Sequence, residues 1–142
     1  MKLFLDTSVL LAAANSATGS SRAIFDLAPT QNWQLISCPY SLNEVRRNLP
    51  RLPAAATTDW QRLRPRLVVH EDVLSLNRPV IFSASKDRPI LFSALAWADF
   101  LLTLDKGDFH DLLGGEFYGL KVCLPYDFLA EERGLGRLKT AR

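Results

Sequence analysis

The sequence has few cysteines and few histidines, with two of each in 142 residues. Cys38 and Cys123 lie far apart, without the close spacing of a metal-binding or redox pair. We therefore expect two buried thiols and not a disulfide. Neither His70 nor His110 falls into a zinc-ligand pattern, and we expect both to be structural or surface residues. Any metal chemistry in this protein should therefore depend on oxygen ligands.

Long apolar runs are also absent. The apolar start of the chain, residues 1–5, is too short for the core of a signal peptide, and Asp6 follows at once. The longest apolar stretch, residues 90–97, is interrupted by Ser93 and closed by Asp99, so it cannot span a bilayer. We therefore expect a cytoplasmic protein with no membrane segment.

Internal repeats, low-complexity tracts and linkers are missing as well. A chain of 142 residues can bury a core without disulfides or a structural metal, but it has no room for a second full core. We expect one domain over residues 1–142.

The net charge is only +2, but the basic residues are unevenly distributed. The segment 46–66 contains one acid, Asp59, and six arginines: Arg46, Arg47, Arg51, Arg62, Arg64 and Arg66. A second basic set, from Arg133 to Arg142, closes the chain. Such runs form either phosphate-binding surfaces or solvated helix faces, and the first interpretation needs a nuclease site nearby. Trp60, within the first set, is expected to pack against a helix, with base stacking as the alternative.

Apolar runs and turn residues predict alternating strands and helices. The expected strands are residues 2–5, 33–37, 67–69, 100–104 and 120–123, and residues 79–82 form a further extended candidate. The expected helices are residues 9–15, 24–29, 39–48, 54–63, 87–98, 109–113 and 125–133. This alternation predicts an α/β fold with a central, mostly parallel sheet. Ligands of such sheets bind outside the carboxyl ends of the strands.

Two of these strands end in a carboxylate. Asp6 follows the first strand and Asp105 follows residues 100–104, with Asp108 three residues further on. Glu44 and Asp87 lie in or at the start of predicted helices. Taken singly, each acid has a simpler explanation as a helix cap or a solvent-facing residue. Taken together, they predict a crevice in which a divalent cation offsets the repulsion between carboxylates.

Four segments of the sequence resemble the PIN domain family: residues 3–10, 41–45, 86–99 and 100–109. Their order and approximate separations match that family along nearly the whole chain. The resemblance implies a three-layer α/β/α sandwich and metal-dependent hydrolysis of single-stranded RNA.

The resemblance assigns roles to particular residues. The implied catalytic residues are Asp6, Glu44, Asp87 and Asp105, and the implied ligands of Mg²⁺ or Mn²⁺ are Asp6, Asp87, Asp105 and Asp108. Thr7 and Ser8 would support Asp6. Arg46, Arg47 and Arg51 would bind the RNA backbone beside this site. Asp99 precedes its strand, so it is expected at the opposite end of the sheet.

Many bacterial relatives of this kind are VapC-like toxins that pair with a small antitoxin and form homodimers, and we expect the same partners here. The alternative is a catalytically silent PIN-like module that binds RNA or regulates another protein. A phosphatase that uses Asp6 as its nucleophile is a further rival. Ser8 argues against it, because phosphatases of the haloacid dehalogenase type place a second aspartate at this position.

Overall fold

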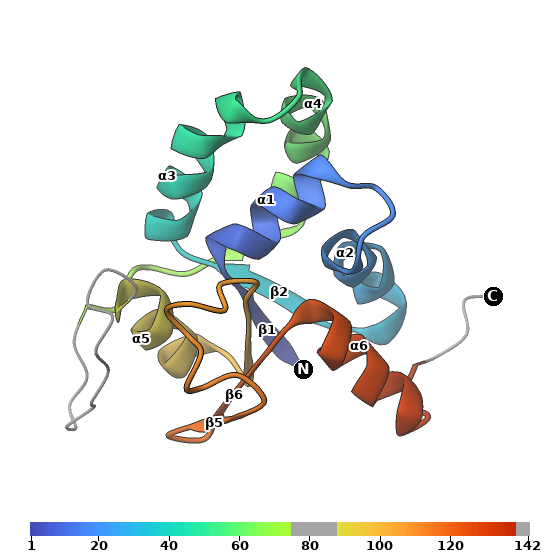
Figure 1. Cartoon of the computed structure of the whole chain (residues 1–142), viewed down its shortest axis with the longest axis vertical. Helices are drawn as coiled ribbons and strands as arrows, with labels where there is room; N and C mark the ends of the chain where they lie inside the picture. Colours follow the sequence, from blue (N-terminus) through green and yellow to red (C-terminus); the bar gives the residue numbers. More distant parts are fainter. Residues whose placement is uncertain (75–87, 139–142) are drawn as a thin grey trace.

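The computed structural model describes residues 1–74 and 88–138 (Figure 1). Within these ranges the strands form a six-stranded sheet in the order β3-β2-β1-β4-β6-β5. The strands are β1 (Lys2–Leu5), β2 (Gln34–Ser37), β3 (Val68–Val69), β4 (Phe100–Leu102), β5 (Gly115–Phe117) and β6 (Leu120–Cys123). All neighbouring strands are parallel except the pair of β5 and β6. The predicted α/β fold with a mostly parallel sheet is confirmed.

Strand β1 lies at the centre of the sheet and pairs with β2 on one side and β4 on the other. Leu3 is in register with Leu35 of β2 and with Phe100 of β4. Because the chain runs from β1 outward to β2 and β3, and later returns to β4, the strand order reverses between β1 and β4. This reversal is where open α/β sheets bind their ligands.

Alternate residues of the strands face two separate cores. Leu3 and Leu5 belong to one buried cluster, and Phe4 belongs to the other. The first cluster includes residues of α1 (Thr7–Asn15), α2 (Ser20–Gln31), α3 (Pro39–Asn48), α4 (Ala54–Leu63) and α6 (Pro125–Gly134). The second contains α5 (Arg88–Trp97) together with apolar residues of the 103–117 segment. The sheet therefore lies between two layers, as Figure 1 shows for α1 and α2 against α5, and the predicted three-layer sandwich is confirmed.

Short 3₁₀ helices extend the helical hairpin that follows β2. The helices η1 (Leu49–Arg51) and η2 (Arg64–Arg66) follow α3 and α4, and each contains a proline. The bounds of α3 and α4 agree with the sequence prediction, since Pro39 lies in the first turn of α3 and Pro53 precedes α4.

The predicted helix at residues 109–113 is wrong, because this segment forms successive turns. The Oδ1 of Asp105 accepts hydrogen bonds from the backbone N–H groups of Gly107 and Asp108, and Gly114 ends the segment at a φ of 80°. Five residues between such constraints are too few to form a stable helix. Strand β5 was not predicted, and the strand expected at residues 100–104 ends at Leu102.

The backbone explains why β4 is short. The N–H of Thr103 still donates to the carbonyl of Cys123, but the N–H of Leu104 donates to the side chain of Ser8. The chain thus leaves the sheet at Leu104. The extended stretch expected at residues 79–82 lies outside the described residues.

Cys38 and Cys123 are both free, as predicted. Burial raises the pKa of the Cys38 thiol to about 11 and that of Cys123 to about 12, so both thiols are unreactive at neutral pH. His70 stacks on Trp97, with 4.6 Å between the ring centroids, and His110 is exposed beside Asp111. No helix in the part of the chain that the structure describes is long and apolar enough to cross a membrane.

Candidate active site

Asp6 lies where β1 ends and α1 begins. Its backbone N–H donates to the carbonyl of Leu102 at 3.0 Å, which joins the carboxyl ends of β1 and β4. Its carbonyl accepts from Val9 and Leu10 in the first turn of α1, so Asp6 is also the N-cap of that helix. Only 4% of Asp6 is exposed. Sheet and helix together therefore hold this carboxylate in one position at the reversal of strand order.

Both oxygens of the Asp6 carboxylate accept hydrogen bonds. Oδ1 accepts from the backbone N–H of Thr7 at 2.7 Å. Oδ2 accepts from the hydroxyl of Ser8 at 3.0 Å and from the hydroxyl of Thr103 at 2.7 Å. The donors lie in the first turn of α1 and just beyond β4, so both of these elements orient the Asp6 side chain.

The two hydroxyls also connect Asp6 to the loop that follows β4. The Thr103 hydroxyl accepts from the backbone N–H of Asp105 at 3.0 Å, and that of Ser8 accepts from Leu104 at 3.0 Å. Thr103 is completely buried. Thr103 was not among the site residues predicted from the sequence. The sequence feature that could have identified Thr103 is a hydroxyl residue at the end of an apolar strand, two positions before an aspartate.

Glu44 approaches the same place from α3. The hydroxyl of Thr7 donates to Oε1 of Glu44 at 2.8 Å. Helix α3 follows β2 directly, and α1 packs against it, so the half-buried Glu44 lies over the start of α1. The backbone N–H of Thr7 donates to Asp6 and the Thr7 hydroxyl donates to Glu44, so Thr7 connects the two carboxylates.

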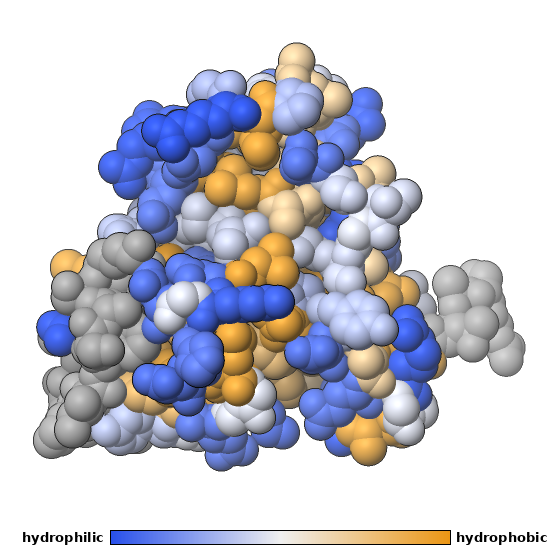
Figure 2. All heavy atoms as spheres, in the orientation of Figure 1, coloured by the Kyte–Doolittle hydropathy of each residue, from blue (hydrophilic) through white to orange (hydrophobic). Residues whose placement is uncertain are grey.

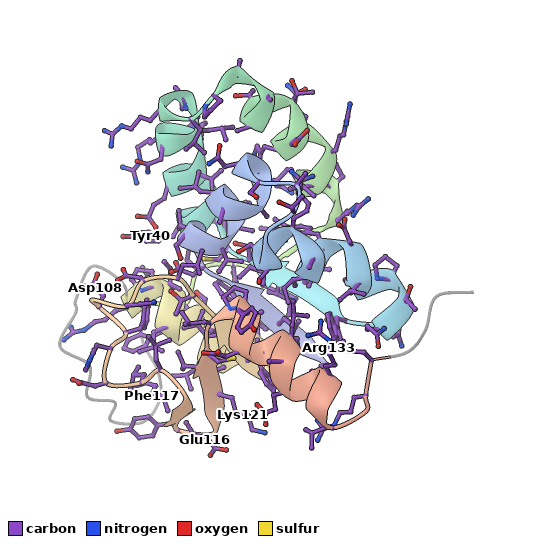
Figure 3. The ribbon with its side chains drawn as sticks, turned by 45° about the vertical axis from the view of Figure 1, so that its right-hand side comes forward. Tyr40, Asp108, Glu116, Phe117, Lys121 and Arg133 are labelled. Carbon is purple, nitrogen blue, oxygen red and sulfur yellow. The ribbon has the colours of Figure 1, made fainter. Side chains whose placement is uncertain are left out.

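Asp105 and Asp108 belong to one tight loop. Besides Gly107, Oδ1 of Asp105 accepts from the backbone N–H of Asp108 at 2.9 Å. This arrangement fixes the Asp105 side chain relative to its own loop. Figure 3 shows Asp108 on this loop.

Of the other two acids, one is placed by the structure and one is not. The Oδ2 of Asp99 accepts from the backbone N–H of Lys2 at 2.8 Å, at the start of β1. Asp99 therefore lies at the end of the sheet away from Asp6, as predicted. Asp87 lies outside the described residues.

Burial raises the pKa of the Asp6 carboxyl from 3.8 to about 6. Hydrogen bonds from Thr103, Ser8 and Thr7 oppose this shift, and the charge of Glu44 adds to it. Near neutral pH the ionised Asp6 is therefore in an unfavourable environment. A nearby cation would relieve that cost.

The donor set fits a hard divalent cation, because it consists of carboxylate and hydroxyl oxygens. Within residues 1–74 and 88–138, no three His, Cys, Asp or Glu side chains converge closely enough to hold a metal ion. Asp6 is instead linked to Glu44 through Thr7 and to the Asp105 loop through Thr103.

Arginines continue from Glu44 along α3 and into η1. Arg46 and Arg47 are exposed in the last turn of α3. Arg51 is exposed in η1 and donates to the side chain of Asn48 at 3.4 Å. A basic surface thus begins within one helical turn of Glu44.

Comparisons with known proteins agree with this architecture. The family model of the PIN domain matches residues 2–107. The chain therefore belongs to the PIN domain family. Its fold is similar to a chain in the crystal structure of VapBC2 from Rickettsia felis bound to a DNA fragment from their promoter. The TM-score is 0.59 and the identity 16%, over 86% of this chain and 97% of the other. No curated protein matches the sequence.

Proposed function

We propose that this protein is a divalent-metal-dependent endoribonuclease that hydrolyses phosphodiester bonds of single-stranded RNA, with residues 1–142 as one nuclease domain. The observation that carries the proposal is the buried carboxylate of Asp6, held by Ser8 and Thr103 at the reversal of strand order. A carboxylate with a pKa near 6 is costly to keep ionised without a cation. Membership of the PIN domain family supports the same chemistry.

Some of the proposed residues would bind the cation, and others would position its ligands. Asp6, Asp87 and Asp105 would bind Mg²⁺ or Mn²⁺, and Asp108 would contribute to a second ion. When bound, such ions lower the pKa of water and stabilise charge on phosphate oxygens. Glu44, oriented by Thr7, would accept a proton or hold a water of the cluster.

Ser8 and Thr103 orient Asp6 and stabilise its charged form, because each hydroxyl donates to Oδ2 while accepting a backbone N–H. Arg46, Arg47 and Arg51 would bind RNA phosphates next to Glu44. Such contacts position the strand without reading its sequence.

We further propose that the protein is the toxin of a toxin–antitoxin pair, that it binds a small antitoxin and that it forms a homodimer. The support is the resemblance of its motifs to VapC-like toxins and the similarity of its fold to a chain of the VapBC2 complex.

The test compares the wild type with Asp6→Asn on labelled single-stranded RNA, with Mg²⁺, Mn²⁺ or EDTA. We expect wild-type cleavage that requires the divalent ion, and a loss of at least about a hundredfold in Asp6→Asn. Asp99→Asn is the matched control, because it neutralises a carboxylate at the opposite end of the sheet.

Equal cleavage by the wild type and Asp6→Asn would contradict the proposal, since the activity would not depend on this site. RNA binding without cleavage in any buffer would favour the silent, RNA-binding module instead. Circular dichroism of each variant would establish that it is folded.

A further inference from the structure

A cavity of about 550 Å³ lies between α3 and α4. Both helices pack against α1, and η1 connects them at one end. Figure 2 shows apolar side chains at the surface between the two helices, and hydrophilic side chains that project from α3. The residues of the lining that bear on its chemistry are Leu42, Asn43, Arg46, Thr57, Trp60 and Arg64. This volume is typical of pockets that hold small molecules, about 300–1,000 Å³.

Trp60 gives the cavity a rigid aromatic wall. The half-buried indole packs against the buried cluster of Ala14, Leu49 and Ala56, and it also lines the cavity. Because the core already orders this side chain, a flat ligand that stacks on it would cost little conformational entropy. Trp60 therefore serves both as packing, as the sequence predicted, and as an accessible aromatic surface.

The charged groups of the lining are both cations, Arg46 and Arg64. Asp59, the one acid between residues 46 and 66, lies on α4 but forms a salt bridge with Arg22 at 2.8 Å. Its charge is therefore compensated. Among the described residues no acid lines the cavity, so its two arginines give it a positive potential, which favours an anionic ligand.

The cavity lies beside the proposed active site. Asn43 and Arg46 line the cavity, while Glu44, which follows Asn43 on α3, accepts the hydrogen bond from Thr7. Val69, the last residue of β3, also lines it, so the cavity opens at the same edge of the sheet as Asp6. Strands β3 and β1 are two strand spacings apart, roughly 10 Å.

We propose that this cavity binds a base of single-stranded RNA. The inference rests on the proposed function and deepens it by naming a contact to the substrate. The base stacks on Trp60, and Asn43 faces its hydrogen-bonding edge. Arg46 and Arg64 bind the adjoining phosphates. The aromatic wall matches the face of a base, the amide matches its hydrogen-bonding edge, and the two guanidinium groups match the phosphates.

The test measures binding of a short, fluorescein-labelled single-stranded RNA by anisotropy in EDTA, so that cleavage does not interfere. Trp60→Leu retains much of the apolar volume and removes the aromatic face, whereas Trp60→Phe retains an aromatic ring. We expect Kd to rise about tenfold in Trp60→Leu and by less than about threefold in Trp60→Phe. An otherwise identical RNA with abasic positions should bind the wild type and Trp60→Leu equally.

Three further variants avoid the core. Thr57→Met partly fills the cavity from an exposed position of α4, and we expect it to weaken RNA binding in the same way. Arg46→Ala and Arg62→Ala remove the same charge, but only Arg46 lines the cavity. We therefore expect the larger loss of affinity in Arg46→Ala. The Thr57 variant decides the question if Trp60→Leu does not fold.

Unchanged affinity in folded Trp60→Leu and Thr57→Met would overturn the proposal and leave the cavity to a protein partner. An equal loss for RNA with and without bases would also overturn it, because the cavity would then respond only to phosphates. The cleavage test with Asp6→Asn is independent of these results. Base-dependent binding without cleavage would support the proposed base site and contradict the proposed nuclease activity.

Discussion

Thr103 is the residue that joins Asp6 to the loop that carries Asp105. Its buried hydroxyl donates to Asp6 and accepts from the backbone of Asp105, so one oxygen atom orients two of the proposed acids. Valine has nearly the same shape but cannot make either hydrogen bond. The Thr103→Val variant therefore isolates the contribution of this hydroxyl to the site.

We expect Thr103→Val to lower the free energy of unfolding by about 2 kcal/mol, because it removes a hydrogen bond to a carboxylate and leaves the half-buried N–H of Asp105 without its acceptor. We also expect RNA cleavage to fall roughly tenfold or more as Asp6 and Asp105 lose their common support. Urea unfolding and cleavage assays measure the two effects.

Ser37→Ala is the control for this prediction. The Ser37 hydroxyl is also buried, at the end of β2, but among the described residues it has no hydrogen-bond partner. Its removal should change stability by less than about 1 kcal/mol. Equal effects of the two variants would mean that the Thr103 hydrogen bonds contribute nothing specific.

At the scale of elements, the hairpin of β5 and β6 depends on its two-residue turn. Tyr118 and Gly119 both have positive φ values, 50° and 89°, as expected of a tight turn between antiparallel strands. Figure 3 shows this hairpin at the edge of the molecule, with Glu116, Phe117 and Lys121 labelled. Space is available around Gly119, where an added Cβ would meet no atom within 4 Å. The conformation of the turn alone therefore determines the effect of a substitution.

We expect Gly119→Ala to destabilise the protein by about 1 kcal/mol, since alanine disfavours this φ. Gly134→Ala, at the end of α6, adds the same methyl group where φ is not positive and should be neutral or slightly stabilising. Thermal unfolding of both variants tests this difference. A similar melting temperature for the two would contradict the role of the turn.

Helix and strand boundaries differ in how far local sequence determines them. Pro39 and Pro53 mark the starts of α3 and α4, and the predicted bounds of both helices were correct. A helix was also predicted at residues 109–113, but this segment forms turns, which the hydrogen bonds to Asp105 and the positive φ of Gly114 favour. Strand β5 is three residues long, too short to show an alternating pattern, and only its pairing with β6 reveals it.

At the scale of the whole molecule, burial of Asp6 couples folding to protons and cations. With a pKa of about 6 when folded, against 3.8 when exposed, the carboxyl binds its proton more tightly in the folded protein. The protonated carboxyl therefore contributes fully to the free energy of unfolding below pH 3.8, and this contribution is lost as the pH rises through about 6. The ionised form then costs up to roughly 3 kcal/mol at neutral pH.

We therefore expect the wild type in EDTA to lose stability relative to Asp6→Asn between pH 4 and pH 7, by at most roughly 3 kcal/mol. Mg²⁺ or Mn²⁺ at pH 7 should restore wild-type stability, because a ligand that binds only the folded state stabilises it, and should leave Asp6→Asn unchanged. Urea titrations at each pH measure this. Parallel pH profiles of the two proteins, with no response to cations, would exclude a cation-binding role for Asp6.

The amino-acid sequence by itself determined the alternating strands and helices, because local apolar runs, prolines and caps specify them. It also placed Asp6 at the sheet edge, since an acid directly after a buried strand must lie there, whereas Asp105 follows the end of β4 by three residues. Only the tertiary structure placed β1 beside β4, where Thr103 reaches Asp6 across 97 positions of the chain. The cavity beside Glu44 also arises only in three dimensions, because α3 and α4 both pack on α1. Such pairings follow from burial of the whole core, which no local stretch of sequence encodes.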